Sequence, residues 1–192
     1  MNKKLIALAV AGACIAPAAM AQTANPVTLY GRVYVTLEQV EGKASGGTAV
    51  SSRTRVQDNS SLLGVRGTED LGGGLKAGFT LLAGLNADNG TANAKFWNRR
   101  STVSLFGSFG EIRLGRDYIP TFWNFGLYDA FGVVGLGATA NVRQMYGGTR
   151  MDNAIGYILP AGLGGFYGQA MVAAGEGGTS GDRPGRHIGA RF

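Results

Sequence analysis

Apolar and polar residues alternate without interruption over residues 27–38, in the stretch VTLYGRVYVTLE. One set of alternate positions is apolar or small, and the other carries threonine, tyrosine, arginine and glutamate. Successive side chains of a β-strand point to opposite faces, so the pattern predicts a strand with one apolar and one polar face. Taken alone, this pattern is compatible with an apolar face on a protein core or on lipid.

The same alternation recurs along the rest of the chain, and no comparable stretch shows a helical period. The recurring segments are residues 63–68, 76–85, 102–106, 111–115, 151–158, 166–173 and 186–192. Together with residues 27–38 they predict eight strands. The chain is therefore predicted to be all-β and antiparallel.

The connections between these segments alternate in length. The short ones are glycine-rich turns at residues 70–74, 107–110 and 159–164, and the long ones are residues 40–59, 86–96, 118–148 and 174–185. Short turns on one side and long loops on the other are typical of an outer-membrane β-barrel. A soluble β-sandwich would explain the alternation equally well, but it does not require this two-sided pattern of connections.

The amino terminus favours the barrel, because it has the pattern of a secretory signal peptide over residues 1–21. Lys3 and Lys4 precede an apolar run, and Ala19-Met20-Ala21 forms a small-residue cleavage site. Cys14 could instead mark a lipoprotein, but the large aliphatic residue expected three positions earlier is missing. Cys14 is also the single cysteine, so the exported part of the chain forms no disulfide.

Charge and hydropathy exclude two further classes of protein. The formal net charge of +6 falls to +4 when Lys3 and Lys4 leave with the signal peptide, and the remaining charges are scattered. A clustered basic face, which nucleic-acid binding requires, is missing, so we expect no nucleic-acid partner. The sequence contains no apolar run of the length that a membrane-spanning helix needs.

Several motifs resemble a known family in their residues and in their order. They are VTLYG at residues 27–31, GVRGTEDLGGGLKA at 64–77, GSFG at 107–110, LGR at 114–116, and Arg150 followed by DNAI at 152–155. This series is similar to the trimeric general-diffusion porins of Gram-negative outer membranes. The resemblance implies an antiparallel transmembrane β-barrel of 16 strands, three barrels in each assembly, and a third external loop folded into the lumen.

The loop implied by this resemblance is residues 118–148, which are rich in apolar and aromatic side chains. Such a loop must pack against a surface, and the inner wall of a barrel offers one. Packing on itself outside the barrel is the alternative. Sixteen strands need about twice the present length, so we expect residues 22–192 to be the N-terminal portion of a porin barrel. An eight-stranded barrel could close, but side chains would fill its interior.

The resemblance also implies which residues line the pore and its constriction. Arg32 and Arg66 lie at polar positions of the first two predicted strands, and Arg116 and Arg150 match constriction arginines of the family. Asp129 is the acid that the loop offers opposite them. The sequence departs from the family at Leu62, where an arginine is common, and near Ala130, where a glutamate is frequent.

The implied function is a water-filled channel for passive diffusion of small hydrophilic solutes and ions, with some preference for anions. Its partners would be outer-membrane lipid and two further copies in a homotrimer. His187 is the single histidine, so no histidine-based triad or metal cluster is expected, and we expect neither cofactor nor enzymatic activity. The alternative is a non-channel outer-membrane protein that displays long loops for adhesion.

Overall fold

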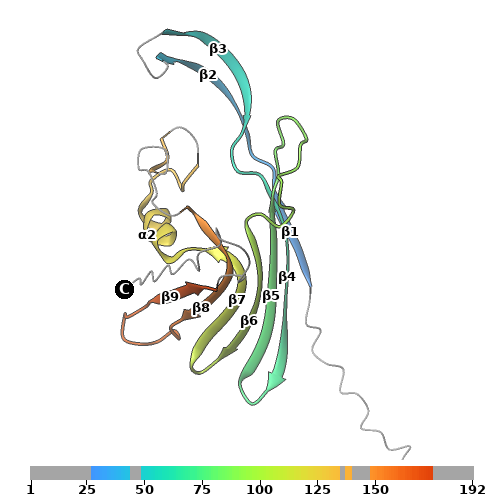
Figure 1. Cartoon of the computed structure of the whole chain (residues 1–192), viewed down its shortest axis with the longest axis vertical. Helices are drawn as coiled ribbons and strands as arrows, with labels where there is room; N and C mark the ends of the chain where they lie inside the picture. The colour runs from blue at the N-terminus through green and yellow to red at the C-terminus, as the bar shows by residue number, and fades with distance from the viewer. Residues whose placement is uncertain (1–26, 44–48, 135–136, 140–147, 175–192) are drawn as a thin grey trace, which may run out of the picture.

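The computed structural model describes residues 27–43, 49–134, 137–139 and 148–174 (Figure 1). In chain order the elements are β1 (Thr28–Arg32), β2 (Val35–Lys43), β3 (Ala49–Asp58), β4 (Leu62–Gly72), β5 (Leu75–Gly84), β6 (Arg100–Gly107), β7 (Gly110–Tyr118), α2 (Pro120–Tyr128), β8 (Arg150–Ile158) and β9 (Gln169–Ala173). Seven strands form one sheet in the order β1-β4-β5-β6-β7-β8-β9, and β2 pairs with β3. Every pairing is antiparallel, which confirms the predicted fold class.

The connections confirm the predicted two-sided arrangement. The turns β4–β5, β6–β7 and β8–β9 lie at one end of the sheet, and the longer connections lie at the other (Figure 1). In the β4–β5 turn, Gly72, Gly73 and Gly74 all have positive φ, a conformation that glycine adopts without a steric penalty. The predicted signal peptide and the predicted strand at residues 186–192 lie outside the described residues.

The first predicted strand and the first long loop differ from expectation. Residues 27–38 divide into β1 and the start of β2, and residues 40–59, predicted as a loop, contain most of the β2–β3 hairpin. At the junction, the backbone N–H of Tyr34 donates to Ser61 Oγ at 2.8 Å, and Ser60 has φ of 78°. This hydrogen bond and the positive φ of Ser60 fix a bend in the chain, and the β2–β3 hairpin projects from that bend beyond the large sheet (Figure 1).

One short helix, α2, lies within the long connection between β7 and β8, where the sequence shows no helical period. Pro120 occupies its first turn, where the missing N–H has no helical partner to lose. Ile119, which is 1% exposed, packs with Phe122 against Met171 of β9 and Ala154 of β8. Tertiary packing therefore stabilises this short helix, which lacks a side-chain cap. Among the described residues, no helix has the length and apolar character needed to cross a membrane.

The large sheet has two chemically different faces. Val103 of β6, Leu114 of β7 and Ile155 of β8 lie opposite one another across the strands, and all three are exposed. Opposite residues of antiparallel strands share a face, so these side chains form an apolar outer row. The next row, which includes Thr102 and Ala154, lies on the face against which α2 packs, called the inner face below. Thr102 is only 4% exposed on this face.

Candidate functional site

Two arginines on β1 and β4 give the inner face an uncompensated positive charge. Arg66 lies opposite Thr80, which lies opposite Thr102, so Arg66 belongs to the inner face. Its guanidinium lies 5.2 Å from the centre of the Tyr30 ring, within the range of a cation–π contact. Arg32 Nε donates to the backbone oxygen of Ser60 at 3.1 Å. In the part of the chain that the structure describes, neither arginine forms an ion pair.

On β6 and β7 the inner face carries four charged side chains that pair with one another, two of each sign. Asp117 accepts hydrogen bonds from Arg100 Nε and Arg113 Nη1, each at 2.6 Å. Glu111 binds Arg113 in a bidentate fashion at 2.7 and 2.8 Å, a strong geometry for this pair. Ser104 Oγ donates to Glu111 at 2.6 Å. We call Arg100, Glu111, Arg113 and Asp117 the β6–β7 charge cluster; its formal charge is zero.

Tyr118, the last residue of β7, links the predicted pore residue Arg150 to the loop helix. The Arg150 guanidinium lies 4.3 Å from the centre of the Tyr118 ring, and its Nη2 donates to the Tyr118 hydroxyl at 2.9 Å. On the loop side, the Phe122 ring stacks on Tyr118 at 4.7 Å between centroids. Trp123 lies 5.4 Å from the same ring. Aromatic and cation–π contacts therefore hold the start of α2 against the wall.

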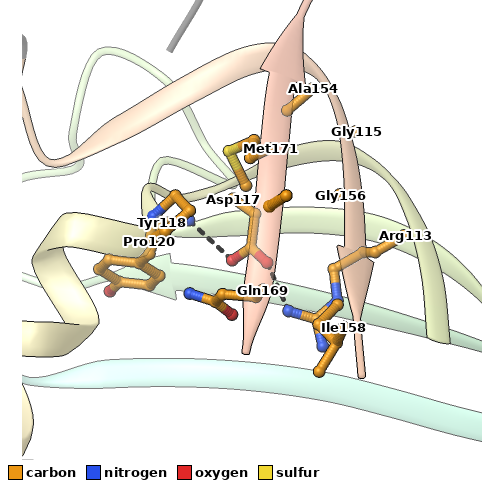
Figure 2. A pocket seen from close by; sticks show the side chains of 11 residues that line it. Arg113, Gly115, Asp117, Tyr118, Pro120, Ala154, Gly156, Ile158, Gln169 and Met171 are labelled. Carbon is orange, nitrogen blue, oxygen red and sulfur yellow. Dashed lines mark hydrogen bonds and ion pairs between the residues drawn. The ribbon is translucent and has the colours of Figure 1, made fainter. Parts of the chain in front are cut away.

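A narrow crevice lies where α2 meets the sheet (Figure 2). Its volume of about 10 Å³ is at the lower limit for one water molecule. Arg113, Asp117 and Pro120 line it together with Met171, and Figure 2 shows the Asp117 carboxylate pointing toward Arg113. The crevice is too small to hold a solute. The start of α2 is therefore in close contact with this part of the wall.

Arg116, the third predicted pore arginine, lies in a different row. It is opposite Ser101, which is opposite Leu81, two positions along β5 from the partner of Val103 and so on the outer face. Arg116 Nη1 donates to Asp152 at 2.5 Å and its Nε to the backbone oxygen of Asn98 at 2.8 Å. The structure therefore does not bring Arg116 together with Arg32 and Arg66, and Asp152 pairs with its charge.

Asp129, the predicted loop acid, is buried and bonded to backbone. Its carboxylate accepts the N–H groups of Phe131 and Thr139, each at 2.8 Å. These hydrogen bonds, that of Phe131 first, hold the pKa of Asp129 below its ordinary value. None of the ion pairs within the described residues joins Asp129 to an arginine. In the structure its carboxylate organises the turn after α2.

The β6–β7 charge cluster was not predicted, although part of it could have been. Glu111 and Arg113 are two positions apart on a strand, so their side chains share a face. That spacing was visible in the sequence. The partnership of Arg100 with Asp117 depends on the pairing of β6 with β7, which periodicity alone does not fix.

A curled antiparallel sheet with an exposed apolar outer face and a charged inner face is the wall of a transmembrane β-barrel (Figure 1). The chain matches the family model described as Gram-negative porin over residues 7–191. The chain belongs to this family, which confirms the resemblance and the outer-membrane location. Among the described residues, β1 and β9 do not pair with each other, so the wall is open.

Relatives of known kind support the same family. The chain is 43% identical over 205 residues to outer membrane porin protein 32 of Delftia acidovorans, covering 98% of this chain and 55% of that protein. It is 33% identical to an outer membrane porin protein of Bordetella pertussis, covering 84% of this chain and 45% of that one. A solved structure, an anion-selective porin from Comamonas acidovorans, is 41% identical with a TM-score of 0.73, covering 86% of this chain and 52% of that one.

The chain thus spans about half the length of these relatives. The relatives are porins, which are channels rather than enzymes. A barrel wall of this kind acts as a channel only when it is closed on itself.

Proposed function

We propose that this chain supplies the N-terminal portion, residues 22–192, of a homotrimeric outer-membrane channel, after removal of a signal peptide at residues 1–21. The channel carries small hydrophilic solutes and ions by passive diffusion, prefers anions, and performs no catalysis. Its wall contacts outer-membrane lipid on the outside and water on the inside.

The single observation that carries the proposal is the division of the sheet into an apolar and a charged face. Outer side chains such as Val103, which is 60% exposed, would be unfavourable in water and are suited to hydrocarbon. The inner face holds arginines, threonines and carboxylates, which lower the cost of moving a hydrated solute across the membrane. A soluble sandwich would bury the apolar face instead.

The anion preference rests on Arg32 and Arg66. Both lie on the inner face without an ion pair in the described part of the chain, whereas the β6–β7 charge cluster is neutral. A positive wall raises the local concentration of anions and lowers that of cations. The name of the solved relative, an anion-selective porin, agrees with this sign.

The loop supplies the narrow region of the proposed pore. Ile119 and Phe122 hold α2 to β8 and β9 on the inner face, so the helix occupies lumen space. Arg150 reaches Tyr118 at the start of this loop, which places its charge beside the narrowing. We assign Arg32, Arg66 and Arg150 to the pore lining. Arg116 and Asp129 contribute less to selectivity, because Asp152 and backbone N–H groups engage them.

Planar-bilayer recording of the complete channel tests the proposal. Stepwise, ohmic conductance should appear, and the zero-current potential in a potassium chloride gradient should have the sign of chloride preference. The Arg32→Gln, Arg66→Gln double variant should move that potential toward cation preference, and the shift should shrink as salt rises because the effect is Coulombic. A properly assembled protein without conductance would refute the channel function.

A further inference from the structure

Asp117 holds two inner-face arginines at once. Its side chain is 3% exposed and accepts from Arg100 and Arg113 at 2.6 Å each. It also accepts the backbone N–H of Tyr118 at 2.7 Å, as Figure 2 shows together with the bond from Arg113. The carboxylate thus accepts three hydrogen bonds, two of them from guanidinium groups, so Asp117, Arg100 and Arg113 form one hydrogen-bonded charged unit.

The backbone at the end of β7 fixes the position of this carboxylate. Gly115 has φ of 119°, and a Cβ there would lie 2.2 Å from the backbone oxygen of Ser101. Only glycine fits such a site. The pairing of β7 with β8 shifts register between Gly115 and Asp117, so that Asp117 lies opposite Met151. The approach of Asp117 to Arg100 and Arg113 is therefore built into the strand rather than left to a flexible side chain.

The charge balance of the inner face depends on this residue. With Glu111 on the other side of Arg113, the β6–β7 charge cluster contributes no net charge. Arg32 and Arg66 lack such partners within the described residues. Asp117 and Glu111 neutralise Arg100 and Arg113, so they lower the net positive charge of the inner wall.

We propose that Asp117 is a specificity-determining residue of the channel, which limits its anion preference by neutralising Arg100 and Arg113. This inference rests on the proposed channel function and adds to it a residue that opposes the preference. Without the carboxylate, the inner wall gains one net positive charge at the level where α2 narrows the lumen. With the carboxylate in place, the channel still prefers anions, but the wall is less positive and binds them less tightly.

The test compares Asp117→Asn with the parent in the complete channel, by zero-current potential in a salt gradient. The anion-to-cation permeability ratio should rise about twofold at low salt, the change expected for one added charge across a water-filled lumen. It should return toward the parental ratio at high salt. Asp70→Asn is the matched control: Asp70 lies 4.0 Å from Lys76 at the turn end of the sheet and is half-exposed, so its loss should change the ratio little.

A second variant keeps the test decisive where Asp117→Asn fails to assemble because two arginines are left under-compensated. The Asp117→Asn, Arg113→Gln double variant removes one charge of each sign and should keep the parental ratio. If the permeability ratio of the double variant fell as far as that of Arg66→Gln, the proposal would be overturned. An assembled Asp117→Asn channel with an unchanged or lower ratio would also overturn it. A parent protein without conductance would instead refute the channel function itself, so the two failures are distinguishable.

Discussion

The Lys95 ammonium and the Arg116 guanidinium bind the same carboxylate, that of Asp152. Lys95 lies on the long connection between β5 and β6, whereas Arg116 and Asp152 lie on neighbouring strands of the wall. One carboxylate thereby joins an external loop to β7 and β8. This pairing distinguishes Arg116 from Arg32 and Arg66 of the inner face, which form no ion pair in the described part of the chain.

The arginines are expected to differ in their effect on ion selectivity. Arg66→Gln should lower the anion-to-cation permeability ratio about twofold at low salt, because it removes an unpaired inner-face charge. Arg116→Gln should change the ratio much less, because Asp152 neutralises Arg116 and its row faces outward. Zero-current potentials of the two variants check this difference. Equal shifts would place Arg116 at the constriction after all.

An arginine on the outer row should destabilise the barrel in lipid. Val103→Arg should lower the free energy of unfolding by about 2 to 4 kcal/mol if residue 103 lies near the middle of the bilayer. Leu37→Arg is the control, because Leu37 is 75% exposed on the projecting β2–β3 hairpin. Denaturant titration of the complete channel in lipid vesicles measures both. Similar losses at the two positions would contradict the assignment of the outer face.

Gly115 should tolerate no side chain. Gly115→Ala combines a positive φ of 119° with a Cβ 2.2 Å from the Ser101 oxygen. Relieving the clash requires β7 to separate from β6, so we expect a loss of about 1 to 3 kcal/mol. Gly156→Ala, where the nearest atom would be 3.8 Å away, should be nearly neutral. The temperature at which the folded channel loses its resistance to detergent compares the two variants.

Acid should loosen the turn after α2 through Asp129. Hydrogen bonds hold the pKa of this carboxyl below the ordinary value of 3.8, so they favour the ionised form. The stabilisation is complete above that ordinary value and is lost as the pH falls through the lower pKa of the folded protein. Single-channel current noise should therefore rise only below about pH 4. Asp129→Asn should show no such acid-dependent step, and a step at higher pH in the parent would contradict the assignment.

Alternation predicted the strands of the large sheet because one face of each strand is apolar. It failed for the second half of β2 and for β3, where Gln39 pairs with Thr54 and Val40 with Arg53, so polar residues occupy both faces. Helix α2 was not predicted because its nine residues are too few to show a helical period. Packing of aromatic side chains such as Phe122 against the sheet stabilises it instead. Tertiary contacts of this kind leave little trace in the local sequence.

The site was predicted in part for the same physical reasons. Arg32 and Arg66 follow from alternation, since each occupies the polar set of its strand. The partners of Arg116 and Arg150 come from other strands, and only the register of those strands reveals Asp152 and Tyr118 beside them. Charge signs were therefore readable from the sequence, whereas their neutralisation required the structure.

Cysteine labelling in lipid vesicles tests the division of the wall into a wet and a lipid-facing side most directly. Cys14 lies in the predicted signal peptide, so Arg66→Cys and Val103→Cys should each introduce one thiol into the exported chain. A membrane-impermeant thiol reagent should label residue 66 from the lumen. Residue 103 should stay unlabelled in vesicles, although its side chain is 60% exposed in the isolated wall, and should react once detergent replaces lipid. Equal labelling of the two positions in intact vesicles would contradict the barrel-wall account.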